Sequence, residues 1–227
     1  MPGLKHRARC VSEPIPAFTS RPSRGLKQPR IVPLEESRIC QDITSLRGLE
    51  GEASALYFSC FDTFILRNGK EFRFHGRSKR PPLDRVNAML SFGYSLIYNE
   101  CIAALESVGL DASAGFLHTD YHGRKSLACD LVEEFRSCIV DRFVLSMINE
   151  NVIRPEHFEM KDNNGIYLNQ EGRKVFLHHW QNNKRNELLH PYLKEKICIG
   201  LIPFAQASLL AKVLRKELPT YPSFSRR

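Results

Sequence analysis

Apolar residues recur at helical spacing over three long stretches of the chain. The first predicted helix runs from about Glu35 to Leu66, the second from Asp84 to about Val108, and the third from Ser126 to about Asn149. The second helix is apolar on nearly all sides, which predicts a place in the middle of the domain. Gly109 is a typical helix end, and Ser126 is a typical N-cap.

A hairpin and two more helices are predicted after the third helix. Residues 158–168 alternate between apolar and polar positions around Asn163-Asn164-Gly165, which is typical of a hairpin turn. Helical periodicity follows over about 169–188 and 193–217. The predicted fold is therefore mainly α, one helical domain with a small β-hairpin.

The two ends of the chain lack this periodicity. Residues 1–35 are basic and rich in proline, so we expect them to be disordered. The predicted helical domain spans 36–221, because Pro219 and Pro222 end regular structure there. Residues 222–227 are expected to form a short basic tail.

The composition disfavours several protein classes. The seven cysteines form no Cys-x-x-Cys pair and mostly lie in apolar helical patterns, which argues against disulfides and a cysteine zinc site. Since there is no long apolar run and no apolar signal segment, we expect a soluble cytoplasmic protein without a membrane partner. Motifs of serine hydrolases, Walker loops, dinucleotide-binding loops and zinc proteases are absent from the sequence.

Positive charge is concentrated in two zones. The net charge of +8 comes mainly from residues 1–33 and 67–80, while the remaining chain is slightly acidic. This pattern is typical of polyanion binding, although a solvated tail and a solvated loop would also produce it. We predict that the second zone grips a nucleic-acid backbone, with Phe72 and Phe74 interleaved among its charges. The predicted contacts are Arg67, Lys70, Arg73, Arg77, Lys79, Arg80 and, outside this zone, Arg124.

Glu50 interrupts the apolar stripe of the first helix. The stripe consists of Ile43, Leu46, Glu50, Ala53 and Tyr57. A carboxylate that faces the core is costly unless it is paired or bound to a metal ion. Gly48 and Gly51 beside it leave room for a close approach. An ion pair with Arg47 or another arginine is the alternative explanation.

Two more carboxylates and a histidine complete a candidate site. Asp130 and Glu133 are three residues apart on one face of the third helix, where they can share a cation. An exposed acidic first turn, favoured by the helix dipole, is the alternative. His118 lies just before this helix, and a lone histidine is more often structural than a ligand. One imidazole and two carboxylates from three segments nevertheless suit Mn²⁺ or Mg²⁺.

Several blocks of the sequence resemble one protein family. They are Arg47-Gly48-Leu49-Glu50-Gly51, residues 80–94, Gly109-Leu110-Asp111, Gly115-Phe116-Leu117-His118 and residues 123–136. Their order and spacing resemble the Cas1 family, the integrase and endonuclease subunits of CRISPR adaptation, over about residues 45–200. The resemblance implies a helical catalytic domain with one Mn²⁺ or Mg²⁺ bound by Glu50, His118 and Glu133. It also implies Asp130 as an acidic neighbour in the catalytic set.

The resemblance implies partners and an activity as well. Family members act as homodimers around a Cas2 dimer and insert captured double-stranded DNA fragments into the repeat of a CRISPR array. A β domain precedes the helical domain in the family, whereas only about 40 residues precede the Arg47-Gly48 block here. We therefore expect this β domain to be missing or truncated. A transposon-type integrase outside CRISPR and a catalytically idle DNA-binding remnant are the other two hypotheses, and the intact Glu50, His118 and Glu133 argue against the second.

Overall fold

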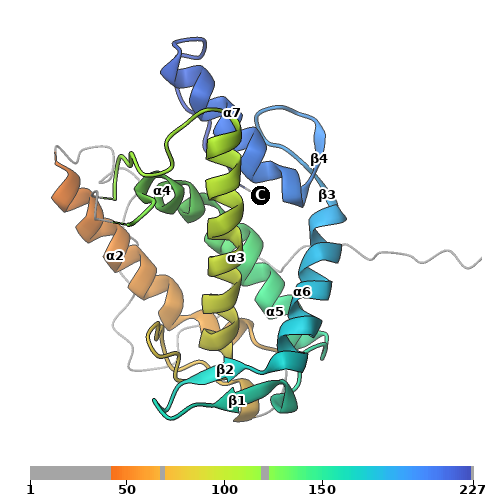
Figure 1. Cartoon of the computed structure of the whole chain (residues 1–227). Helices are drawn as coiled ribbons and strands as arrows, with labels where there is room; N and C mark the ends of the chain where they lie inside the picture. The colour runs from red at the N-terminus through yellow and green to blue at the C-terminus, as the bar shows by residue number, and fades with distance from the viewer. Residues whose placement is uncertain (1–41, 67–69, 119–122, 226–227) are drawn as a thin grey trace, which may run out of the picture. The chain divides into compact units, whose positions relative to one another are not determined.

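The computed structural model describes residues 42–66, 70–118 and 123–225. The chain divides into units of residues 1–31 and 32–227, and all described residues belong to the second unit (Figure 1). Helices dominate this unit, which confirms the predicted mainly α fold. The segment expected to be disordered, residues 1–35, lies outside the described residues. The elements are α2 (Ile43–Ser59), α3 (Arg85–Ser107), α4 (Ser126–Phe135), α5 (Arg142–Asn149), β1 (Phe158–Met160), β2 (Ile166–Leu168), α6 (Gln170–Arg185), β3 (Glu187–Leu189), β4 (Lys196–Cys198) and α7 (Ile202–Leu214).

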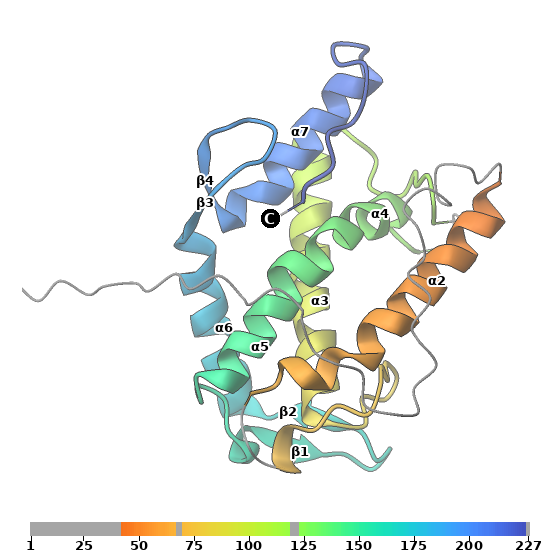
Figure 2. The same ribbon diagram turned by 180° about the vertical axis from the view of Figure 1, so that it is seen from behind.

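Helix α3 runs through the middle of the described unit, between α2 and α6 (Figures 1 and 2). It begins where Oδ1 of Asp84 accepts the N–H of Asn87 at 2.7 Å. It ends at Gly109, whose φ of 79° allows the N–H of Leu110 to reach the carbonyl of Leu105 at 3.0 Å. The helix packs against α4, α5 and α7, so the predicted central helix is confirmed.

Helices α4 and α5 form the predicted third helix, joined by a π-helical turn at Arg136–Asp141. The predicted N-cap is wrong: Lys125 is the N-cap, and Ser126 is the first helical residue and fully buried. The N–H groups of the second and third helical residues, Leu127 and Ala128, donate instead to the carbonyl of Ala112. A carbonyl from the preceding loop thus takes the role that sequence patterns assign to a serine side chain.

The first predicted helix is shorter than expected. Helix α2 ends at Ser59 and is followed by a 3₁₀ turn, Phe61–Phe64. Aromatic side chains at its C-terminal end, Tyr57, Phe58 and Phe61, pack against one another and against the core. Residues 35–41, the predicted start of the helix, lie outside the described residues.

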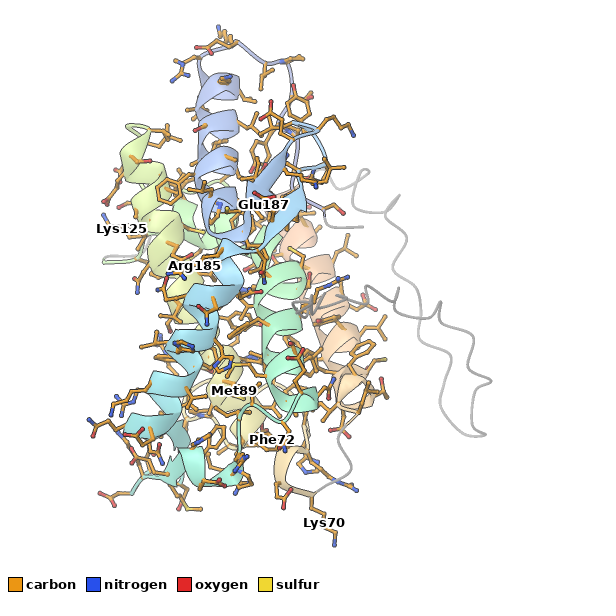
Figure 3. All side chains as sticks on the ribbon, turned by 90° about the vertical axis from the view of Figure 1, so that its right-hand side faces the viewer. Lys70, Phe72, Met89, Lys125, Arg185 and Glu187 are labelled. Carbon is orange, nitrogen blue, oxygen red and sulfur yellow. The ribbon has the colours of Figure 1, made fainter. Side chains whose placement is uncertain are left out.

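The predicted hairpin is present, and a second one was missed. Strands β1 and β2 pair antiparallel, with Met160 opposite Ile166. Where the last helix was expected to begin at residue 193, β3 and β4 pair instead, with Leu188 opposite Ile197. The turn between them holds Lys194 at a φ of 59°, a left-handed conformation that interrupts a helix. In Figure 3, Arg185 and Glu187 mark the passage from α6 into this hairpin.

The segment expected to be a tail takes part in packing. Phe224 is buried and contacts the rings of Phe135 and His190. Its N–H donates to Oε2 of Glu134 at 2.7 Å. Cys60, Cys101, Cys129 and Cys198 are free thiols. Across the described ranges, none of the helices has both the length and the apolar character needed to cross a membrane.

Gly93→Val should destabilise the contact between α3 and the π-turn. A Cβ at residue 93 would lie 2.6 Å from Cγ1 of Val140 and 3.5 Å from Cζ of Phe176. We expect the free energy of unfolding, measured with urea, to fall by about 1–3 kcal/mol because of this overpacking. Adding Val140→Ala removes the clashing methyl groups. The double variant should therefore lose less stability than the two single losses combined, and simple additivity would contradict the proposed clash.

Candidate active site

Asp130 holds the loop that carries His118. Its Oδ2 accepts the backbone N–H groups of Phe116 and Leu117 at 2.6 and 3.1 Å, and its Oδ1 accepts that of His118 at 2.9 Å. The same Oδ1 lies 2.6 Å from Nδ1 of the His118 ring. Asp130 therefore positions the histidine, and Nε2 is the ring nitrogen left to meet a ligand.

Glycine at position 115 allows this loop to lie against the start of α4. A Cβ there would lie 2.7 Å from Cβ of Ser126 and 2.8 Å from the carbonyl oxygen of His118. Both are closer than real Cβ contacts, and one is to backbone. The loop can therefore approach α4, and present its N–H groups to Asp130, only without a side chain at residue 115.

Arg47 ties α2 to the same loop. Its Nε donates to the carbonyl of Leu117 at 2.8 Å, and its Nη2 donates to the same oxygen. Glu50 lies three residues later and so shares the loop-facing side of α2. The alternative of an ion pair between Glu50 and Arg47 or another arginine is not found among the described residues, and the Arg47 guanidinium donates to the loop backbone instead.

The stripe predicted around Glu50 does not face the core along its whole length. Ala53 is exposed and Glu50 is half-buried, whereas Tyr57 packs against the core. Helix α2 is anchored mainly at its C-terminal end, so the turn with Glu50 stands at the edge of the described unit. The prediction that Glu50 faces the core is therefore wrong, because this turn of α2 is largely exposed and Glu50 is only half-buried.

Glu133 is a half-buried carboxylate that pairs with Arg136 but has one oxygen without a hydrogen bond. Burial raises the pKa of its carboxyl group, Arg136 lowers it, and nearby Glu50 raises it. His118 and Lys79 also lower the pKa, by smaller amounts. Oε1 lies 3.0 Å from Nη2 of Arg136 but without hydrogen-bond geometry, so this buried atom has no hydrogen-bond partner among the described residues. A cation beside Glu133 would remove this deficit.

Glu50, His118 and Glu133 come from α2, a loop and α4. They are close enough to shift the pKa of Glu133, although the described residues contain no group of three or more His, Cys, Asp or Glu side chains arranged to hold a metal ion. Two carboxylates, one imidazole nitrogen and an orphaned buried oxygen fit Mn²⁺ or Mg²⁺. The metal site stays a prediction.

Asp130 and Glu133 do not form the carboxylate pair that their spacing suggested. Both oxygens of Asp130 are bonded to the loop and to His118. The alternative of an exposed acidic turn is wrong as well, because both side chains are half-buried. The role of Asp130 is therefore to orient a neighbour.

Only part of the predicted DNA-contacting set lies near these residues. Arg67 is outside the described residues. Lys70 and Arg73 are exposed, and Figure 3 shows Lys70 extending away from the ribbon. Phe72 and Phe74 are 2% and 5% exposed and belong to the core, so within this zone only the charged residues can contact a nucleic-acid backbone. The two buried rings, which alternate with charged residues, anchor the loop to the domain.

Arg77, Lys79, Arg80 and Arg124 do converge near the candidate site. Two adjoining hollows of about 630 and 250 Å³ share Arg80, Tyr94, Ser95 and Arg136 in their walls. We call these two hollows the basic cleft. The remaining basic lining residues are Arg124 in the larger hollow and Arg77 and Lys79 in the smaller one. Burial and then the positive charges of Arg136 and Arg77 lower the pKa of Lys79.

Sequence reasoning missed Arg136 and Tyr94. The guanidinium carbons of Arg77 and Arg136 each lie 5.3 Å from the centre of the Tyr94 ring. The signal for Arg136 was its place three residues after Glu133 on a helix. Tyr94 lies on α3 and donates its hydroxyl to Asp141 of the π-turn, for which the sequence has no recognisable mark.

A buried carboxylate lies behind the cleft. Asp141 accepts the hydroxyl of Tyr94 at 2.6 Å through Oδ1 and that of Tyr57 at 2.9 Å through Oδ2. Burial raises the pKa of Asp141 from its ordinary value to about 6, although both tyrosines favour its charged form. Asp141 therefore joins α2 and α3 through the π-turn, at a cost in desolvation.

The chain matches the model of one protein family, described as CRISPR associated protein Cas1, over residues 28–182. It is 48% identical over 182 residues to CRISPR-associated endonuclease Cas1 2 of Rhodospirillum rubrum, covering 80% of this chain and 53% of that protein. It is 42% identical over 184 residues to CRISPR-associated endonuclease Cas1 of Leptospira interrogans, covering 81% and 72%. The chain thus spans about half the length of curated relatives such as the first.

Solved structures share the fold. A casposase bound to integration product matches with a TM-score of 0.75 at 29% identity, over 82% of this chain and 52% of that chain. A Cas1 protein from Thermotoga maritima matches with a TM-score of 0.71 at 28% identity, over 81% and 58%. A chain of a Cas6-RT-Cas1–Cas2 complex matches at 0.71 and 26% identity, over 85% and 21%.

Asp130→Asn should loosen the loop that carries His118. An amide has one acceptor oxygen and no charge, so it cannot keep both sets of the hydrogen bonds that the carboxylate accepts. We expect amide hydrogen exchange of residues 116–118 to accelerate by about tenfold or more, while that of α3 changes little. Mass-spectrometric exchange measures both regions at once. Unchanged protection of the loop would show that Asp130 does not hold it.

Asp141→Asn should change the pH dependence of stability in a defined direction. With its pKa near 6 in the folded state, Asp141 keeps a proton where the unfolded chain releases it. Its contribution is therefore most favourable below about pH 4, is lost as the pH rises through 6, and stays low above. Relative to the parent, the variant should gain up to about 3 kcal/mol between pH 4 and pH 7.5. Urea unfolding at several pH values measures this, and a pH-independent difference would refute it.

Proposed function

This chain belongs to the family of CRISPR-associated Cas1 proteins, and on that premise we propose that it is a metal-dependent DNA endonuclease and integrase. It would join captured DNA fragments to a CRISPR array. The observation that supports the proposal is that Glu50 and His118 lie near enough to Glu133 to shift its pKa, and that Glu133 contacts Arg136 in the wall of the basic cleft. The curated relatives are named endonucleases, which supports a nuclease.

The residues present suit one divalent cation. Glu50, Glu133 and Nε2 of His118 would hold it, and Asp130 would keep the imidazole in the correct orientation through Nδ1. A bound Mn²⁺ or Mg²⁺ would supply charge stabilisation at a phosphodiester. Glu133, with its raised pKa and its orphaned oxygen, is the carboxylate with most to gain from such a ligand.

The basic side chains have a separate role in this proposal. Lys79 lies close enough to Glu133 and Glu50 for their charges to raise its pKa against the effect of burial. A phosphate held by Lys79 and Arg80 would therefore lie beside the carboxylates. Positioning of the attacking hydroxyl or water in line with the leaving oxygen then yields integration or hydrolysis at one centre.

Double-stranded DNA, a second copy of this chain and a Cas2 dimer are the proposed partners. Support for DNA comes from the casposase neighbour, described as bound to integration product. Support for Cas2 comes from the Cas6-RT-Cas1–Cas2 complex. A homodimer rests on the family resemblance alone. The casposase likeness also favours the second candidate, an integrase of the same fold that acts outside a CRISPR locus.

Loss of any proposed ligand should abolish metal-dependent cleavage. Glu50→Gln, His118→Ala and Glu133→Gln should each reduce Mn²⁺-dependent cleavage of branched DNA by at least about 100-fold. Since the three residues line the surface, thermal unfolding should change little. Glu52→Gln is the matched control, an exposed carboxylate on the same helix. Parent-like cleavage by all three variants, or equal loss in the control, would overturn the site.

A further inference from the structure

We propose that Arg77 and Arg136 form a phosphate clamp in the basic cleft, which binds a non-bridging oxygen of a DNA strand beside Glu133. The inference deepens the proposed function and rests on it, because it takes the anion to be a DNA phosphate. It goes beyond the predicted basic zone in two ways. It adds Arg136, which lies on the π-turn, and it distinguishes arginines that hydrogen bonds and ring contacts hold in place from exposed side chains that are not held.

Arg77 is held in place before any ligand arrives. Its Nη1 donates to Oδ1 of Asn87 at 2.7 Å and to the carbonyl of Ser78 at 2.5 Å, and its Nη2 donates to Oγ of Ser91 at 3.2 Å. Asn87 is itself fixed, because its Nδ2 donates to Asp84 and to the carbonyl of Gly76. Such a guanidinium has a defined direction, unlike a surface lysine.

Arg136 approaches the same point from the π-turn. Its Nη2 faces Glu133 at 3.0 Å, and its guanidinium, like that of Arg77, lies over the Tyr94 ring. The Tyr94 hydroxyl is fixed by Asp141. One aromatic ring with a fixed hydroxyl therefore sets the positions of two arginines from separate segments.

The two arginines leave a deficit of negative charge in the cleft. The Nε of Arg77 and the Nε of Arg136 are buried without a hydrogen-bond partner among the described residues. None of the described residues in the walls of the basic cleft is an aspartate or glutamate. Arg136 pairs with Glu133, whereas no ion pair of Arg77 occurs among the described residues, so the two guanidinium groups share one counter-ion, and their like-charge contact is unfavourable. An oxyanion in the 250 Å³ hollow would meet both guanidinium groups.

The place of the clamp defines its ligand chemistry. Because Arg136 contacts Glu133, an anion held by both arginines lies next to the proposed metal ligands. Guanidinium groups recognise phosphate by paired donors, and backbone phosphates carry no base sequence. The clamp should therefore bind DNA strands of any sequence and contribute to salt dependence.

Arg85 provides a matched control within the chain. It is also half-buried, its Nε is also buried without a hydrogen-bond partner in the described chain, and it also lies over an aromatic ring, that of Phe158 at 6.0 Å. Its Nη1 donates to the carbonyl of Glu71 at 2.8 Å. Arg85, however, is not in the walls of the basic cleft. If an orphaned nitrogen alone produced DNA binding, Arg85 would contribute as much as the clamp.

The test is DNA binding by the full chain without cleavage. Fluorescence anisotropy measures binding of labelled oligo-dT and of a mixed-sequence duplex, in chelator and over a range of salt concentrations. The salt slope is the change in the logarithm of affinity with the logarithm of salt concentration. Arg77→Gln and Arg136→Gln should each lower the slope by about 1 and weaken binding of both DNAs about equally. Arg85→Gln should leave it unchanged. An unchanged slope in both clamp variants, or an equal loss in Arg85→Gln, would overturn the clamp.

Lysine variants keep the test valid if a glutamine variant unfolds. Arg77→Lys and Arg136→Lys retain the charge but lose the paired donors of the guanidinium. The salt slope of DNA binding should therefore stay near that of the parent, while the affinity for DNA falls at every salt concentration. Affinity equal to the parent would refute paired recognition by a guanidinium.

Mn²⁺ binding, measured by electron paramagnetic resonance, separates the clamp from the proposed function. Arg136→Gln removes a cation that competes for Glu133, so Mn²⁺ should bind at least as tightly as in the parent. Weaker Mn²⁺ binding would mean that Arg136 only supports the site, against the clamp. Should the clamp variants lose slope while the Glu50, His118 and Glu133 variants still cleave DNA, the proposed function fails and the clamp stands.

Discussion

The carboxylate of Asp130 accepts the N–H groups of three consecutive residues and meets the ring of His118. The loop it holds has no regular secondary structure, so its position depends on this side chain. The Leu117 carbonyl of the same loop then receives Arg47 from α2. One charged group, with N–H donors converging on it, thus relates α4, the histidine loop and the helix of Glu50. Hydrogen bonds to a charged acceptor are strong enough for this task, about twice those between neutral groups.

Two adjacent glutamates give α4 two different attachments. Glu133 faces Arg136, whereas Oε2 of Glu134 accepts the N–H of Phe224 at 2.7 Å and a hydrogen bond from Nε2 of Gln206 at 2.8 Å. Burial raises the pKa of Glu134, and these donors lower it. Since neighbours on a helix point in different directions, one turn of α4 both fixes the C-terminal segment and lines the site. The sequence shows only a Glu-Glu pair and cannot assign these roles.

Features with strong local signals could be predicted from the sequence. The apolar run and the Asp84 and Gly109 ends defined α3, and Asn163-Asn164-Gly165 defined the first hairpin. Glu50 stood out against its apolar stripe, whereas His118 and Glu133 stood out only through their combination with it on separate segments. The π-turn and the second hairpin were missed, because tertiary contacts and not local propensity decide them. Phe72 and Phe74 misled for the same reason: alternation with charges looks alike in an exposed loop and in one anchored to a core.

The hydrogen bonds of Asp141 with Tyr57 and Tyr94, behind the cleft, give a reason to keep a buried carboxylate. Asp141 is 1% exposed. Burial raises its pKa more than the hydrogen bonds from Tyr94 and Tyr57 lower it, so burying the charged carboxylate is costly. A hydrophobic residue there would avoid this cost but would leave the hydroxyls of Tyr57 and Tyr94 without their acceptor. The Tyr94 ring would then be free to tilt, and with it the two arginines stacked on it. The buried Asp141 thus lowers stability but keeps the two guanidinium groups in place beside Glu133. Positive charge that is fixed before the reaction needs no reorganisation during it.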